Sequence, residues 1–166
     1  KPWKPTSIRI RFGESVSEAC SQNDGGKRRK GYSTNDHAMR DMIMQIPSDG
    51  QIEIGSTGFR FIRIDCLSPN TTMYLKEAPA IFRYRNIPYL GSFRCNDQRL
   101  NDIWMTGAYT VHLNMQEYLW DGIKRDRLIW LGDMHPEVAT IMSVFGHNEV
   151  VNKSIDLACE QFPLPQ

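Results

Sequence analysis

The spacing of apolar residues changes near the middle of the chain. In the first half, short segments alternate apolar with polar side chains, as strands do when only one face is buried. From Asp97 onward, apolar residues recur every three or four positions, which is the period of a helix with one buried face. Strands followed by helices predict an α+β fold or two separate domains. We place the boundary after residue 90.

The alternating segments are short and are separated by turn-forming residues. Gly, Asn, Asp and Ser cluster at residues 23–26, 48–50 and 55–58, where the chain is expected to reverse. Such short strands are typical of antiparallel pairs, so the pattern predicts an antiparallel β-sandwich over residues 1–90. The predicted strands are residues 7–12, 38–44, 51–54, 59–64 and 80–85.

Three helices are predicted in residues 91–166. The first has about five to six turns, with Asn96 as its N-cap. The second runs over residues 136–144, with Asp133 near its start, and the third over residues 148–161. Because these helices carry apolar residues on more than one side, we expect them to begin a larger helical assembly, and the chain to be a segment of a longer polypeptide. The apolar stripe of the first helix consists of Leu100, Ile103, Trp104, Gly107, Ala108, Val111, Met115 and Tyr118.

The net charge and the lack of long apolar runs exclude some classes of partner. A formal charge of +1 gives no general attraction to nucleic acid or to an anionic membrane. No apolar run reaches the roughly 18–20 residues that span a bilayer. The first residues lack the apolar core of a signal peptide, yet an export signal can precede them. The compartment therefore stays open, with the periplasm or the extracellular space slightly favoured over the cytoplasm.

Residues 120–133 form the segment that is richest in chemically useful side chains. They contain three carboxylates, three cations and two tryptophans. Cleavage of a glycosidic bond needs one carboxylic acid to protonate the departing oxygen and a second carboxylate to activate water or attack carbon. Aromatic faces pack against the C–H surfaces of sugars. The composition of this segment therefore favours a sugar-cleaving site.

A second interpretation of the same residues is a solvated loop. In that case Asp126 pairs with Arg125 or Arg127, and Asp133 caps the helix that follows. Flanking cations also favour the ionised form of a carboxyl, whereas a general acid must hold its proton. Asp126 can therefore act as an acid only where burial or a neighbouring carboxylate outweighs those cations. The arginines, in turn, could point at sugar hydroxyls or hold Asp121.

From Asp121 to Asp133 the chain reads Asp-Gly-Ile-Lys-Arg-Asp-Arg-Leu-Ile-Trp-Leu-Gly-Asp. This run resembles the acidic signature of the bacterial α-L-rhamnosidases of glycoside hydrolase family 78, roughly Asp-Cys-Pro-x-Arg-Asp-Glu-Arg-x-x-Trp-x-Gly-Asp. Residues 91–104 resemble the entry into that family's first barrel helix. Residues 11–15 and 58–64 resemble the β-sandwich that precedes the barrel. The resemblance covers nearly the whole chain.

The resemblance implies hydrolysis of terminal α-L-rhamnosides with inversion, in an (α/α)₆ barrel of six helical hairpins. It implies that Asp126 is the general acid and that four other residues, Asp121, Arg125, Trp130 and Asp133, bind the sugar. The general base would lie beyond residue 166, so residues 1–166 alone are expected to be inactive. Asp126 stands where the pattern has Glu, and the stretch before it is one residue shorter. The expected partner is a rhamnose-containing glycan or glycoside, with no cofactor, no metal and an open oligomeric state.

A different class of function stays open beside this one. The β-sandwich could be a non-catalytic carbohydrate-binding or structural module, with the helices as an extension. No serine-hydrolase elbow, P-loop or dinucleotide-binding glycine pattern occurs in the sequence.

Several other motifs favour ordinary structural roles. The four cysteines, at positions 20, 66, 95 and 159, have neither zinc-site spacing nor the density of a disulfide framework, so free thiols are predicted, with a single bridge left open. His135 and Glu137 are too few for a zinc site. Residues 27–30 are a cationic run that is typical of a solvated hairpin tip, and residues 70–72 fit an N-glycosylation acceptor. His112 and His147 are predicted to be packing or capping residues.

Overall fold

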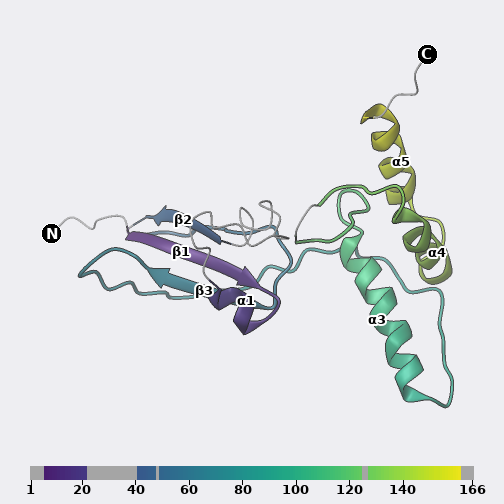
Figure 1. Ribbon diagram of the computed structural model, residues 1–166, viewed down its shortest axis with the longest axis horizontal. Coiled ribbons are helices and arrows are strands. Elements are labelled where there is room, and N and C mark those ends of the chain that lie inside the picture. The colour runs from purple at the N-terminus through teal and green to yellow at the C-terminus, as the bar shows by residue number, and fades with distance from the viewer. Residues whose placement is uncertain (1–5, 22–40, 48, 125–126, 162–166) are drawn as a thin grey trace. The chain divides into compact units, whose positions relative to one another are not determined.

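The computed structural model describes residues 6–21, 41–47, 49–124 and 127–161. The chain divides into two compact units, Lys1–Ala80 and Ile81–Gln166, and each is described by itself. The first unit contains a small sheet and the second contains three long helices (Figure 1). The predicted α+β class is therefore confirmed. The domain boundary after residue 90 stays a prediction, because compact packing alone does not test it.

The first unit is built on a three-stranded antiparallel sheet in the order β2-β1-β3. Its strands are β1 (Thr6–Gly13), β2 (Asp41–Ile46) and β3 (Phe61–Cys66), and Figure 1 shows β1 between the other two. All three overlap predicted strands. The cationic run at residues 27–30 and the turn at residues 23–26 lie outside the described residues. The described part contains this one sheet, so the β-sandwich stays a prediction.

The alternation along β1 determines which side of the sheet is apolar. Ile8, Ile10 and Phe12 are buried, whereas the intervening arginines form ion pairs across the sheet. Arg9 donates two hydrogen bonds to Asp41, at 2.7 and 2.6 Å. Arg11 is buried, and its Nη2 donates to Asp65 at 2.5 Å. Neighbouring strands are thus joined by paired charges in addition to their backbone hydrogen bonds.

A short helix, α1 (Val16–Cys20), follows β1 directly and was not predicted, because five residues are too few to show a helical period. Its N-cap is Ser15, whose side chain accepts a hydrogen bond from the backbone N–H of Glu18. The helix packs so close to the end of β1 that a Cβ on Gly13 would lie 2.6 Å from the backbone nitrogen of Ala19. Glycine is therefore required at this turn.

Two predicted strands, residues 51–54 and 80–85, are wrong. Residues 51–54 end at Gly55 and Ser56, whose φ angles of 126° and 65° break an extended chain. In residues 80–85, side chains from the end of α3 take the backbone acceptors. The imidazole of His112 lies 2.6 Å from the carbonyl oxygen of Arg85, and Gln116 donates to the carbonyl of Arg83. Alternation of apolar and polar residues does not produce a strand when no neighbouring strand provides backbone hydrogen bonds.

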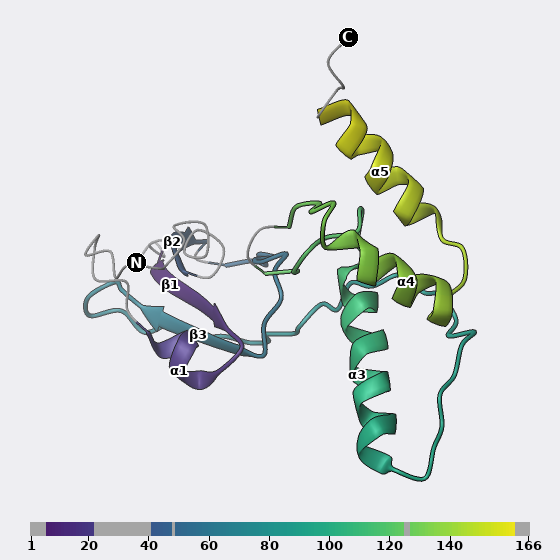
Figure 2. The same ribbon diagram turned by 45° about the vertical axis from the view of Figure 1, so that its right-hand side comes forward.

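The three predicted helices of the second unit are confirmed. They are α3 (Gln98–Asn114), α4 (Met134–Val144) and α5 (Glu149–Gln161), and α4 lies against α3 (Figure 2). The N-cap of α3 is Asp97 and not Asn96, because the Asp97 carboxylate accepts a hydrogen bond from the backbone N–H of Arg99. No helix in the described part of the chain is long and apolar enough to cross a membrane.

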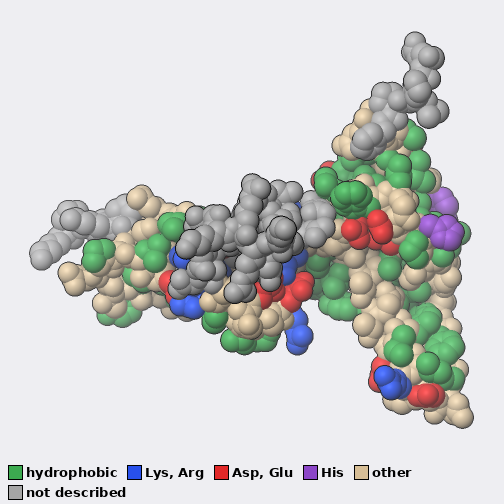
Figure 3. All heavy atoms as spheres, viewed as in Figure 1, with side chains coloured by type: hydrophobic (Ala, Val, Ile, Leu, Met, Phe, Trp, Pro, Cys, Tyr) green, Lys and Arg blue, Asp and Glu red, His purple; other side chains and the backbone are tan. Residues whose placement is uncertain are grey.

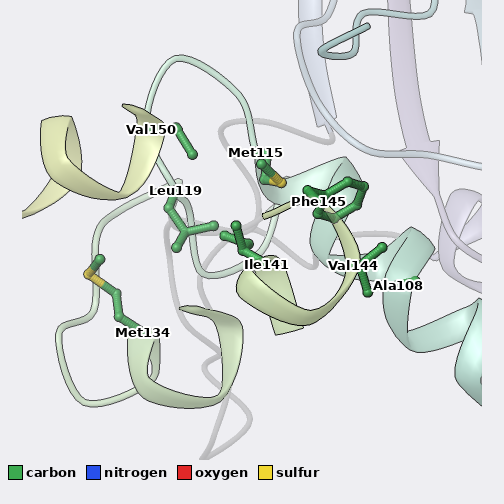
Figure 4. Packing of buried hydrophobic residues seen from close by; sticks show 8 residues of the cluster. All are labelled: Ala108, Met115, Leu119, Met134, Ile141, Val144, Phe145 and Val150. Carbon is green, nitrogen blue, oxygen red and sulfur yellow. The ribbon is translucent and has the colours of Figure 1, made fainter. Parts of the chain in front are cut away.

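One hydrophobic cluster joins these helices and their connections. It consists of Ala108, Met115, Leu119, Met134, Ile141, Val144, Phe145 and Val150 (Figure 4). Met115 and Leu119 come from the chain just after α3, where they face each other in an isolated β-bridge. Helix α3 therefore ends earlier than predicted. The chain turns there so that both side chains enter the core.

Two polar contacts fix the backbone around this cluster. The fully buried hydroxyl of Ser154 accepts a hydrogen bond from the N–H of Leu119 at 2.8 Å and donates to the carbonyl of Val150 at 2.7 Å. The carbonyl of Val144, at the end of α4, accepts hydrogen bonds from the N–H groups of Leu90 and Gly91, at 2.7 and 2.9 Å. Segments that are distant in sequence are thereby held together.

His112 has a packing role, as predicted. It is buried, and its two ring nitrogens lie 3.2 Å from the Tyr89 hydroxyl and 2.6 Å from the carbonyl oxygen of Arg85. Because a carbonyl only accepts, Nε2 carries a proton and donates it to Arg85. Tyr89 and Phe145 also contact the imidazole ring. Every polar atom of this ring is thus used within the fold.

Replacing Gly91 by alanine is expected to destabilise the helical unit. The new Cβ would lie 1.9 Å from the backbone oxygen of Ser143, so the backbone must shift. We expect the free energy of unfolding to fall by about 1–3 kcal/mol in urea titrations followed by tryptophan fluorescence. The matched control is Gly107→Ala, since a Cβ on Gly107 meets nothing within 4 Å, and this change within α3 should stabilise. Equal effects of the two substitutions would contradict this packing.

Ser154→Ala is expected to leave the buried N–H of Leu119 without its acceptor. Loss of such a partner costs about 1–3 kcal/mol of unfolding free energy. The control is Ser143→Ala, whose exposed hydroxyl bonds only within its own helix, to Ala139 at 2.8 Å. This control should change stability by less than about 0.5 kcal/mol. Equal stability of Ser154→Ala and the parent would show that the bond does not hold Leu119.

Candidate functional site

The candidate site begins where the buried chain emerges from the core. Leu119 is buried, and the next residue, Trp120, donates its N–H to the carbonyl of Asn114 at 3.1 Å. The N–H of Asp121 then donates to the carbonyl of Leu128 at 2.9 Å, which closes residues 121–128 into a loop. Gly122 lies near the start of this loop with a φ of 82°. The sharp turn there requires a residue that tolerates a left-handed backbone.

Arg125 and Asp126 lie in this loop but outside the described residues. Asp126 is the predicted general acid and Arg125 is a predicted sugar-binding residue. The alternative, in which Asp126 pairs with Arg125 or Arg127, also depends on Asp126, which is not described. Both roles, and the pairing, stay predictions.

Trp130 and Asp133 lie at the turn that leads into α4. The carbonyl of Trp130 accepts hydrogen bonds from the N–H groups of Asp133 and Met134, at 3.0 and 3.1 Å. Asp133 occupies the N-cap position, but its side chain makes no capping hydrogen bond. The prediction that this carboxylate caps the helix is therefore wrong. The exposed Trp130 side chain and the exposed Asp133 carboxylate both remain open to a ligand.

The carboxyl group of Glu137, in the first turn of α4, has a raised pKa. Burial, followed by the negative charges of Asp121 and Asp133, raises the pKa of Glu137 from 4.5 to about 7. Asp133 and Glu137 are four residues apart, a spacing that places them on the same face of the helix. Two of the predicted sugar-binding residues, Asp121 and Asp133, therefore lie close enough to Glu137 for their charges to act on it.

Sequence reasoning missed Glu137 as a member of this group. The sequence indicates Glu137 only together with His135, as a pair too small for a zinc site. The usable signal was the four-residue spacing from Asp133 at a helix start, but the contribution of Asp121 depends on how the loop folds. In the described part of the chain no group of three His, Cys, Asp or Glu residues is arranged to hold a metal. The four cysteines are free, as predicted.

Arg127 contributes a cation near the loop's end. Its guanidinium carbon lies 5.9 Å from the centre of the Trp120 ring, within the range of a cation–π interaction. Its backbone has a φ of 49°, which is uncommon for a residue with a side chain. The loop is thus held by a peptide hydrogen bond and a side-chain contact at the same place.

Two comparisons with known proteins bear on this site. Residues 88–162 match the family described as the bacterial alpha-L-rhamnosidase 6 hairpin glycosidase domain. A solved structure of a rhamnosidase from Klebsiella oxytoca with rhamnose bound has the same fold, with a TM-score of 0.71 and 20% sequence identity. The similarity covers 95% of this chain and 31% of that one, so the chain spans about a third of the rhamnosidase's length. No curated protein sequence matches the chain.

The matched residues include the whole of the candidate site, from Trp120 to Glu137. The fold likeness extends over both units. The resemblance that the acidic segment indicated is therefore confirmed: residues 88–162 match the six-hairpin glycosidase domain family of the bacterial α-L-rhamnosidases.

Proposed function

We propose that this chain supplies one side of an active site that hydrolyses terminal α-L-rhamnosides with inversion. The proposal rests on one observation. Asp121 and Asp133 both act on the carboxyl of Glu137, and the exposed Trp130 lies between them in the sequence of the segment that matches a rhamnosidase family. Neither Asp121 nor Asp133 has an ion pair or a side-chain hydrogen bond with the described residues. Both carboxylates can therefore accept hydrogen bonds from sugar hydroxyls.

Each predicted residue has a chemical role in this proposal. Asp126 protonates the glycosidic oxygen as the bond to the anomeric carbon breaks. Asp121 and Asp133 bind hydroxyl groups of the rhamnose ring, and Trp130 packs against its C–H face. Arg125 donates hydrogen bonds to the sugar. Support for a deoxysugar comes from the related structure, which contains bound rhamnose.

The second carboxylate of the mechanism is proposed to lie outside residues 1–166. An inverting enzyme needs its general base roughly 6.5–9.5 Å from the acid, so that a water molecule fits between them. The chain corresponds to 31% of the related rhamnosidase, which leaves ample chain for a distant base. We therefore expect no turnover from residues 1–166 alone.

The surface of α3 supports a larger helical assembly. Leu100, Ile103, Met105 and Tyr109 are each about half exposed, at 48%, 58%, 50% and 49%. Figure 3 shows apolar side chains spread over the visible face of the helical unit. An exposed apolar surface of this kind is normally covered in a folded protein. We propose that α3, α4 and α5 are the first helices of an (α/α)₆ barrel whose other helices cover it, and that residues 1–90 belong to a β-sandwich before the barrel.

Substitutions in the site should separate catalysis from binding in the intact protein. Asp126→Asn removes the proposed acid and should lower kcat on p-nitrophenyl α-L-rhamnoside by about 10²–10⁴-fold with little change in KM. Asp133→Asn and Trp130→Ala should instead raise KM. The control is Asp156→Asn, which changes an exposed carboxylate on α5. Unchanged kinetics in all three site variants would remove the support for this function.

The pKa of Glu137 predicts how stability depends on pH. In the folded protein this carboxyl keeps its proton up to about pH 7, whereas in the unfolded chain it ionises near 4.5. The stability that it contributes is present below pH 4.5 and is lost as the pH rises through 7. Glu137→Gln carries no charge at any pH. The variant's stability relative to the parent should therefore increase between pH 4.5 and 8, by at most about 3 kcal/mol, as measured by urea unfolding.

The control for this experiment is Glu160→Gln, which changes an exposed carboxyl on α5. This variant should follow the pH dependence of the parent. Parallel curves for Glu137→Gln and the parent would show that neither burial nor the charges of Asp121 and Asp133 raise the pKa of Glu137.

A further inference from the structure

Two interactions join the two ends of the loop at residues 121–128. One is the hydrogen bond from the N–H of Asp121 to the carbonyl of Leu128, at 2.9 Å. The other is the contact of the Arg127 guanidinium with the ring of Trp120, at 5.9 Å. The two interactions involve adjacent residues, because Trp120 precedes Asp121 and Arg127 precedes Leu128. We call these four residues, Trp120, Asp121, Arg127 and Leu128, the clasp.

The backbone of Arg127 indicates that the clasp constrains the chain. Its φ of 49° is disfavoured for a residue with a Cβ and persists only where the surroundings hold it. The Leu128 carbonyl follows directly and is fixed by the Asp121 N–H. The guanidinium contact on Trp120 fixes the same residue through its side chain. Both the backbone next to Arg127 and its side chain are therefore held in place.

The chain on each side of the clasp is connected to the core of the helical unit. On one side, Leu119 is buried and its N–H is bonded to Ser154. On the other side, Ile129 packs against the same hydrophobic cluster. The clasp thus connects Asp121 to the segment that carries Trp130 and Asp133. These are the three described residues proposed to contact the sugar.

We propose that Arg127 is a positioning residue that holds Asp121 in register with Trp130 and Asp133 through its contact with Trp120, without touching the sugar. This inference rests on the proposed sugar-binding function. A preorganised set of contacts binds more tightly than one that must be ordered on binding. Loss of the guanidinium therefore weakens sugar binding indirectly, by freeing Asp121.

The test combines amide exchange with sugar binding in the intact protein. In the absence of sugar, Arg127→Ala is expected to increase hydrogen exchange at the Asp121 amide by at least roughly tenfold, because its closing bond opens more often. The Leu119 amide stays protected, which shows that the variant is folded. The dissociation constant for L-rhamnose should rise by roughly three- to tenfold, as expected for loss of one cation–π contact. Arg127→Lys keeps the cation and should recover most of the affinity.

A double-mutant cycle with Trp120 separates positioning from direct contact. Trp120→Leu should weaken rhamnose binding by a similar factor, and the double variant should be no weaker than either single one, because both remove the same contact. The matched control is Arg60→Ala, since Arg60 lies over Phe61 at the same distance of 5.9 Å but in the first unit. This control should leave both readouts unchanged.

Two results would overturn the inference. If the double variant raises the dissociation constant by the product of the factors for Arg127→Ala and Trp120→Leu, the two residues act separately. Unchanged exchange at the Asp121 amide, with weakened binding, would mean that Arg127 contacts the sugar itself. Failure of the parent protein to bind L-rhamnose would instead reject the proposed function. Even then, the rate of hydrogen exchange at the Asp121 amide in Arg127→Ala, compared with the parent, would show whether the clasp exists.

Discussion

The hydrogen bond from the N–H of Leu119 to the buried hydroxyl of Ser154 fixes the point at which the candidate site begins. The side chain of Leu119 lies in the core, so the preceding chain cannot slide or rotate without breaking both contacts. The other end of the segment enters α4, where Met134 is buried in the same core. A loop whose two ends are anchored in one core can expose polar side chains in a defined arrangement without a core of its own.

The start of α4 carries an electrostatic cost that the fold must offset. Burial, and then the negative charges of Asp121 and Asp133, favour the protonated form of the Glu137 carboxyl. A protein that needed only a stable loop would do better with a cation or a neutral side chain at one of these positions. Groups with perturbed ionisation concentrate at functional sites. The stabilising contacts elsewhere, including the Val144 carbonyl that accepts from Leu90 and Gly91, offset this cost.

Much of the fold followed from the sequence, and the failures have physical reasons. Strong alternation predicted the strand that contains Ile8 and Ile10, and the helical period predicted all three long helices. Residues 80–85 alternate equally well but form no strand, because side chains of α3 and the chain after it take their carbonyl groups. In the candidate site, the resemblance to the rhamnosidase signature predicted that Asp121, Trp130 and Asp133 bind the sugar. It could not identify Glu137 or the Trp120–Arg127 contact, since both depend on a fold that brings separate turns together.

A crystal structure of the intact protein with L-rhamnose tests most directly the proposal that rhamnose binds between Asp121, Trp130 and Asp133. We expect sugar hydroxyls within hydrogen-bond distance of the Asp121 and Asp133 carboxylates, with the Trp130 ring against a C–H face of the sugar. Rhamnose bound only on residues 1–90, with these three side chains unoccupied, would contradict this proposal and would favour a carbohydrate-binding module instead.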